Sequence, residues 1–131
     1  MAKPDRREIR LGRLELQIMD VVWDRGHATV HDVKDVLGRG RKPAYSTILT
    51  MMRKLEQKGY LAHEVQDRTY VYHATVGRQE VRRGMLGDLL ERVFEDSPAL
   101  LLTSLMERRR ISEQERRRIH ELIRKRGDGN G

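Results

Sequence analysis

The sequence predicts a mostly α-helical protein with one small β-hairpin, organised as two parts that differ in kind. Apolar residues recur at helical spacing through most of the chain, whereas residues 60–74 alternate apolar and polar side chains around Asp67-Arg68. From Gly77 onward the pattern is wholly helical. We therefore expect a helix-and-hairpin domain at residues 11–77 and a helical domain at residues 78–126. Residues 1–10 and 127–131 are expected to be flexible termini.

The first helix is expected over residues 11–26, LGRLELQIMDVVWDRG. Leu14, Ile18 and Val22 recur every fourth position and form one apolar stripe. Gly26 follows the last apolar position, where glycine commonly ends a helix. This segment therefore predicts an amphipathic helix with one face toward a core.

A second, short helix is expected to begin after Thr29, a good N-cap residue. Asp32 stands three positions later, as a capping-box partner should. The helix is expected to end at Gly38. A loop at 39–42 then leads to Pro43, which suits the start of a third helix.

The third helix is expected over Ala44–Lys58, with Ile48, Met51, Met52 and Leu55 facing the core. A two-residue turn at Asp67-Arg68 would then form a hairpin. Its predicted cross-strand pairs are Leu61 with Ala74, His63 with Tyr72, and Val65 with Tyr70. Three helices followed by a hairpin are the layout of a winged helix-turn-helix.

The third helix carries the sharpest functional pattern, because small hydroxyls, an aromatic and cations lie opposite its core stripe. These residues are Tyr45, Ser46, Leu49, Thr50, Arg53 and Lys54. Such a face suits a recognition helix that reads base edges and thymine methyl groups in a major groove. Thr47 and the amides that follow Ala44 could hold a phosphate. The alternative is an ordinary solvated helix face.

Arginines outside this helix offer weaker evidence for DNA contact. Arg68 at the hairpin tip could reach a phosphate or the minor groove, although an arginine in a turn is usually just solvated. The N-terminal arm could lie along a DNA backbone or be a frayed terminus. Its cations are Lys3, Arg6, Arg7, Arg10 and Arg13.

The overall charge is +7 at pH 7, with a pI of about 10.1. This balance favours a polyanionic partner, with nucleic acid ahead of an anionic membrane surface. The excess is spread over both halves, +4 in residues 1–77 and +3 in 78–131. We expect the triple arginines at 108–110 and 116–118 to be surface residues, with intersubunit pairing as the next possibility.

The C-terminal apolar residues are too many for three short helices to bury among themselves. They are Leu86, Leu89, Leu90, Phe94, Leu101, Leu102, Leu105, Ile119, Leu122 and Ile123. Either these helices fold back on the first domain, or they form half of a core shared with a second copy. We favour an intertwined homodimer, because the intervening positions are rich in arginine.

Catalytic, metal and membrane roles find little support. The chain has no cysteine, its five histidines are not spaced as a ligand set, and no P-loop or G-x-S-x-G motif occurs. We expect no catalytic residue, no metal and no cofactor. No apolar run approaches the roughly 20 residues of a membrane span, and the N-terminus lacks the apolar core of a signal peptide. We therefore expect a cytoplasmic protein.

The sequence resembles the penicillinase repressor (BlaI/MecI type) family of winged-helix transcriptional regulators. The resemblance rests on LGRLELQIMDVVWDRG, VHDVKDVL, AYSTILTMMRKLEQKGYL and the DRTYVYHAT wing, and it extends more loosely to residue 125. It implies a bacterial homodimer that binds palindromic operators in double-stranded DNA. It also implies repression, often of genes for β-lactam resistance.

Carried over by position, the family's recognition helix falls on Ala44–Lys58, with Thr47 and Thr50 at positions the family uses at DNA. Leu49 stands where some members have an arginine that approaches DNA. Well-known members are inactivated by a regulatory protease between an Asn and a Phe, where this chain has Thr103-Ser104. Nor does the chain have the C-terminal cysteines of the copper-responsive branch, so the inducing signal stays open.

The hypothesis from the sequence is a homodimeric, sequence-specific repressor of β-lactam resistance or related stress-response genes. Two alternatives stay open. One is an architectural DNA-binding protein without sequence preference, and the other is a protein-interaction module.

Overall fold

A computed structural model describes residues 10–38, 43–108 and 111–129. The expected flexible N-terminus up to residue 9, the loop at 39–42 and residues 130–131 lie outside the described residues. The chain divides into two compact units, Met1–Asp88 and Leu89–Gly131. Across the described ranges, no helix is both long enough and apolar enough to cross a membrane.

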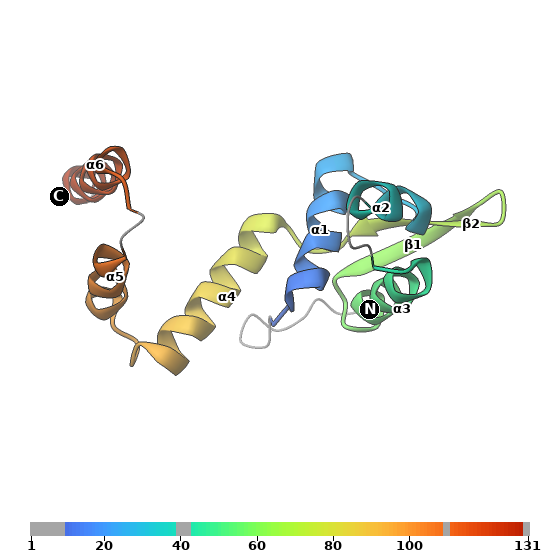
Figure 1. Ribbon diagram of the computed structural model, residues 1–131, viewed down its shortest axis with the longest axis horizontal. Helices are drawn as coiled ribbons and strands as arrows, with labels where there is room; N and C mark the ends of the chain where they lie inside the picture. Colours follow the sequence, from blue (N-terminus) through green and yellow to red (C-terminus); the bar gives the residue numbers. More distant parts are fainter. Residues whose placement is uncertain (1–9, 39–42, 109–110, 130–131) are drawn as a thin grey trace. The chain divides into compact units, whose positions relative to one another are not determined.

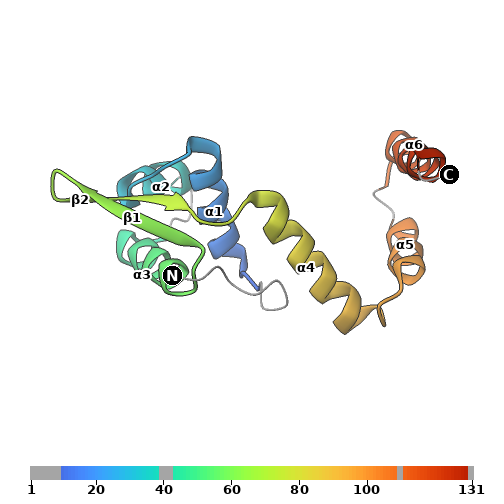
Figure 2. The ribbon, with the colours of Figure 1, turned by 180° about the vertical axis from the view of Figure 1, so that it is seen from behind.

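The first unit contains three helices and a hairpin, in the order predicted (Figure 1). The bounds are α1 Arg13–Arg25, α2 Val30–Leu37, α3 Tyr45–Gln57, β1 Leu61–Gln66 and β2 Thr69–Ala74. In both ribbon views the hairpin extends beyond α2 and α3 as a wing (Figures 1 and 2). The predicted winged helix-turn-helix fold is confirmed.

Local hydrogen bonds fix the ends of the first two helices. Gly26 ends α1 with φ of 84° and donates its N–H to the carbonyl of Val22 at 2.8 Å. The left-handed φ is one that glycine adopts without strain. At the start of α2, the Thr29 N–H donates to the Asp32 carboxylate at 2.9 Å, and the Asp32 N–H donates to the Thr29 hydroxyl at 3.1 Å. The predicted capping box is therefore present.

The core of the first unit lies between the three helices and the base of the hairpin. Its most deeply buried apolar side chains are Ile18, Met19, Val22, Val33, Ile48, Met52, Leu55, Tyr60, Leu61 and Tyr72. On α3 the predicted inward residues Ile48, Met52 and Leu55 are fully buried, and Met51 is half-buried. This packing holds the opposite face of α3 outward.

The hairpin has the predicted antiparallel register, with Leu61 opposite Ala74 and Val65 opposite Tyr70. Asp67 and Arg68 both adopt positive φ, 50° and 68°, as a tight primed turn requires. A further bridge was not predicted. Ala28, just before α2, exchanges two backbone hydrogen bonds with Tyr72 at 2.8 and 2.9 Å, and so ties the wing to the helices.

Helix α4, Arg78–Val93, is attached to the first unit by its N-terminal half. Val81 and Gly84 are buried and Met85 packs on the core, so the first compact unit reaches Asp88, past the boundary expected at residue 77. Just before the start of α4, the carbonyl of Val76 accepts a hydrogen bond from the Trp23 indole N–H at 2.9 Å.

A cation at the start of α4 adds to this attachment. Arg78 pairs with Asp24 at 2.7 Å, and its guanidinium lies 5.3 Å from the centre of the Trp23 ring. The hydrogen bond to Asp24 raises the pKa of Arg78.

The second unit contains the end of α4 with α5, Pro98–Glu107, and α6, Glu113–Gly129. The hydroxyls of Ser97 and Ser112 accept hydrogen bonds at the starts of α5 and α6, each at 3.1 Å. The α6 helix continues to Gly129, although the tail was expected to be loose from Gly127. Within 89–127, apart from 109–110, no residue is buried.

Candidate nucleic-acid interface

The outward face of α3 is a polar stripe. Ser46, Thr50 and Arg53 follow at spacings of four and three, which place them one above another on a helix. All three are exposed, and Gln57 extends the row by a further turn. Gln57 was not predicted as a site residue, although the same spacing would have found it.

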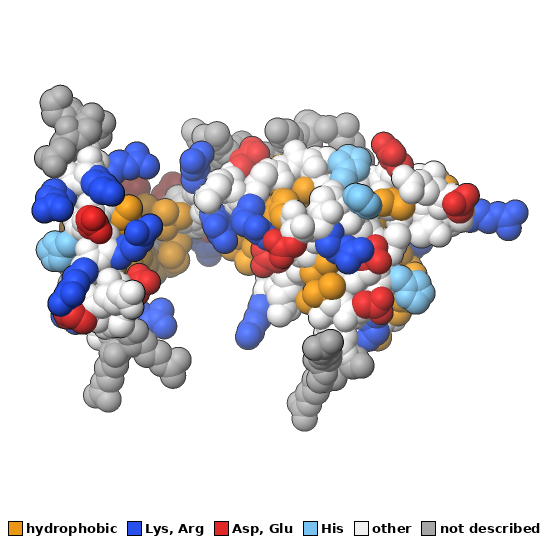
Figure 3. Space-filling view, turned by 90° about the horizontal axis from the view of Figure 1, so that it is seen from above, with side chains coloured by type: hydrophobic (Ala, Val, Ile, Leu, Met, Phe, Trp, Pro, Cys, Tyr) orange, Lys and Arg blue, Asp and Glu red, His pale blue; other side chains and the backbone are white. Residues whose placement is uncertain are grey.

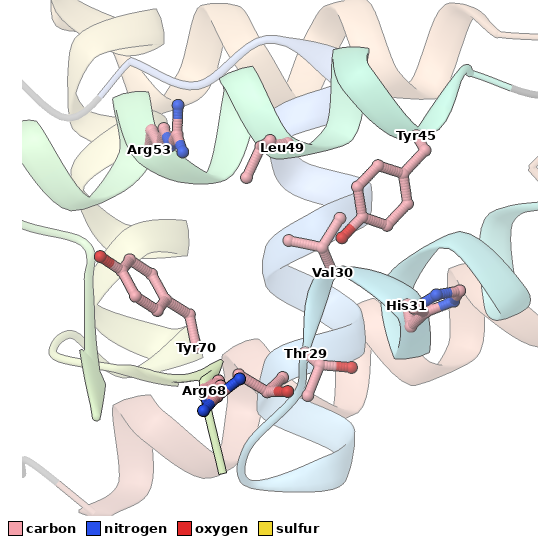
Figure 4. A pocket seen from close by; sticks show the side chains of 9 residues that line it. Thr29, Val30, His31, Tyr45, Leu49, Arg53, Arg68 and Tyr70 are labelled. Atoms are coloured by element: carbon pink, nitrogen blue, oxygen red, sulfur yellow. The ribbon is translucent and has the colours of Figure 1, made fainter. Parts of the chain in front are cut away.

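Beside this stripe, a groove of about 320 Å³ opens between α3, the start of α2 and the wing (Figure 4). Its lining residues are Thr29, Val30, His31, Tyr45, Leu49, Arg53, Arg68, Thr69 and Tyr70. Three chain segments therefore contribute to one concave surface. In Figure 4, the α3 residues Leu49 and Tyr45 point from the helix toward the space above Val30.

The groove is positively charged. Arg53 from α3 and Arg68 from the hairpin turn both line it, and no carboxylate is among its lining residues. Both arginines are exposed, and neither is ion-paired with another described residue. Two unpaired guanidinium groups with five donors each suit phosphate oxygens.

The start of α2 adds a histidine and a helix end to the groove. Exposed His31 lies beside Tyr45, with 5.4 Å between ring centres. The Thr29 hydroxyl accepts a hydrogen bond from the Asp32 N–H, which leaves its own O–H free to donate. Sequence reasoning missed His31 because one exposed histidine in a short helix has no pattern of its own.

The wing is held against the end of α3 by a second cluster. Both carboxylate oxygens of Glu56 lie within 2.8 Å of Nδ1 of His63 on β1. The His63 ring stacks on Tyr70, with 3.9 Å between ring centres and 10° between planes. Tyr72 is buried on the same face, and burial raises the pKa of its phenol. Glu56 and His63 thus position Tyr70, which lines the groove.

The structure distributes the predicted DNA-binding residues over two neighbouring surfaces. Tyr45, Leu49, Arg53 and Arg68 share the groove. The others are exposed on α3 or at its start, outside the groove lining: Ala44, Ser46, Thr47, Thr50 and Lys54. Ala44 is the N-cap, and its carbonyl accepts hydrogen bonds from the backbone N–H groups of Thr47 and Ile48.

The predicted dimerisation residues are all at least partly exposed. Leu86, Leu89, Leu105, Leu122 and Ile123 are exposed, and the side chains in between are half-buried: Leu90, Phe94, Leu101, Leu102 and Ile119. Apolar side chains accordingly show among basic side chains on the surface of the second unit (Figure 3).

Side chains of the types that bind metals are spread over the part of the chain that the structure describes. There, no three His, Cys, Asp or Glu side chains come close enough together to hold an ion.

The fold and this groove define a winged helix-turn-helix protein. The chain belongs to the penicillinase repressor family, whose pattern matches residues 11–125. The family resemblance seen in the sequence is thereby confirmed.

The chain is similar to transcriptional regulator BlaI of Mycobacterium tuberculosis (strain CDC 1551 / Oshkosh), with 36% identity over 89 residues, 67% of this chain and 64% of that protein. It therefore spans just under two thirds of the mycobacterial relative. It is also 22% identical over 109 residues to the penicillinase repressor of Bacillus licheniformis, covering 83% of this chain and 85% of that one.

Among solved structures, it is similar to the DNA binding domain of the repressor BlaI, with a TM-score of 0.50 and 25% identity. That match covers 59% of this chain and 92% of the other. The relatives are named regulators and repressors, in agreement with the prediction that the chain is not an enzyme.

Proposed function

We propose that this protein is a sequence-specific DNA-binding transcriptional repressor. One observation carries the proposal: the same winged-helix unit has an outward polar stripe on α3 and, beside it, a groove lined by Arg53 and Arg68. The names of the similar proteins, a DNA binding domain and a penicillinase repressor, support it.

In this mechanism α3 enters a major groove and the wing follows the neighbouring backbone. Arg53 and Arg68 neutralise phosphates, which gives affinity for any duplex. The hydroxyls of Ser46 and Thr50, with the Gln57 amide, then discriminate between bases at their edges. Glu56 and His63 hold the wing at a fixed distance from α3, so both elements meet one duplex together.

We further propose that two copies bind a palindromic operator in the cytoplasm. The unburied leucines of the second unit support this, since a second copy would cover them. Two linked half-sites bind more tightly than one through effective concentration, so a signal that weakens the dimer would relieve repression. The family name supports β-lactam resistance genes as the targets.

The test is selection of bound duplexes from a random pool, followed by titration of the recovered and scrambled duplexes by fluorescence anisotropy. We expect a symmetric site that binds at least about a thousandfold more tightly than its scrambled version. Equal affinity for all duplexes would replace the proposal with an architectural role. No binding at low salt would leave only protein partners for the groove.

A further inference from the structure

Two aliphatic side chains line the positive groove, and of these Val30 is buried whereas Leu49 is not. Leu49 lies one turn after Tyr45 and one turn before Arg53 on α3, and its side chain points into the groove (Figure 4). It is only half-buried, so part of it faces any molecule that occupies the groove. On the α3 side, the groove thus presents an apolar side chain between the polar Tyr45 and the cationic Arg53.

This centre restricts what can lie against it. Leucine neither donates nor accepts hydrogen bonds. In the major groove, the edge of a G·C pair presents only acceptors and an amino donor, which leucine would desolvate without replacing their partners. The one apolar group on a base edge in that groove is the C5 methyl of thymine.

We propose that Leu49 selects a thymine in each half-site by covering its C5 methyl group. This inference rests on the proposed function, since it names the base chemistry that the groove reads. Arg53 and Arg68 bind the phosphates beside the groove and so hold the duplex with that base edge against α3. Leu49 is then a specificity-determining residue, and the arginines are sequence-independent contacts.

The test replaces each thymine of the selected duplex by uracil, one at a time. Uracil keeps every hydrogen-bonding atom of thymine and lacks only the methyl group. Covering one methyl is worth roughly 0.8 kcal/mol, which corresponds to about a fourfold change in affinity. We expect this loss at one thymine of each half-site, measured by anisotropy with the full chain.

The assignment to Leu49 is tested by a double-mutant cycle. Leu49→Ala should bind the thymine duplex more weakly, and the difference between thymine and uracil should disappear at that position only. Leu49→Met, which keeps an apolar side chain of similar size, should retain the difference. Circular dichroism melting checks that both variants are folded.

The outcomes separate this inference from the proposed function. If no sequence is selected from the pool, the proposed function fails. If a site is selected but no thymine in it depends on its methyl group, DNA reading stands and the inference is wrong. If a sensitive thymine keeps its full sensitivity in Leu49→Ala, another residue covers that methyl and the assignment is overturned.

Discussion

Neutralising one groove arginine should change the salt dependence of DNA binding by a predictable amount. Arg53→Gln and Arg68→Gln each remove one cation from the groove but keep a polar side chain. Both arginines are exposed, and neither is ion-paired with another described residue. The substitutions should therefore leave the folded unit intact, so a change in binding reports the interface and not stability.

The magnitude follows from counterion release. Each phosphate that a protein neutralises contributes about −0.9 to the slope of log affinity against log salt concentration. In a dimer each substitution removes two contacts, so the slope should become less steep by about 1.8. When salt rises from about 50 to about 200 mM, the factor by which affinity falls should then be roughly ten times smaller for the variant than for the wild-type protein.

The assay is anisotropy titration of the selected duplex at four or more salt concentrations in that range. Arg116→Gln on α6 is the matched control, since it removes the same charge from an exposed site in the second unit. Its slope should equal that of the wild-type protein. Three variants with the same slope would refute the reasoning, because affinity would then follow net charge rather than the groove.

Three further results are expected. Leu122→Glu should convert a dimer at micromolar concentration into a monomer in sedimentation, because a charge would enter the shared core; an unchanged dimer contradicts the assignment. Trp23→Phe should lower the free energy of unfolding by about 1 to 2 kcal/mol in urea titrations, since the hydrogen bond to Val76 is lost. The hydrogen bond from the Thr29 N–H lowers the pKa of Asp32 below its ordinary 3.8, so this bond stabilises the fold above that pH and is lost as pH falls through the lowered value. The stability advantage over Asp32→Asn should accordingly be present at about pH 6 and absent at about pH 2; a pH-independent difference would contradict it.

Local chemistry made much of the first unit predictable. The capping box at Thr29 and Asp32 involves residues three apart, and the hairpin register follows from the two-residue turn at Asp67-Arg68. Both features are determined by residues that are close in sequence, so both can be predicted from the sequence alone. The buried stripe of α3 followed from helical periodicity in the same way.

The groove was less predictable because its walls come from three separated segments. Its α3 side was expected, but His31 and Tyr70 entered it through the packing of α2 and the wing. The bridge between Ala28 and Tyr72, which brings those segments together, uses backbone groups only. Backbone pairing of one residue with one distant residue leaves no trace in composition or periodicity.

The two units differ in a way that connects stability to repression. The first has a closed core, whereas none of the described residues of the second from Leu89 to Gly127 is buried. Its α5 has only 10 residues, and isolated helices below about 12 to 15 residues are marginal in water. We therefore expect a covering surface to stabilise the second unit, and in the proposed dimer a second copy supplies it. Operator affinity would then depend on protein concentration and on any ligand that competes for the exposed leucines, while the winged unit itself stays unchanged.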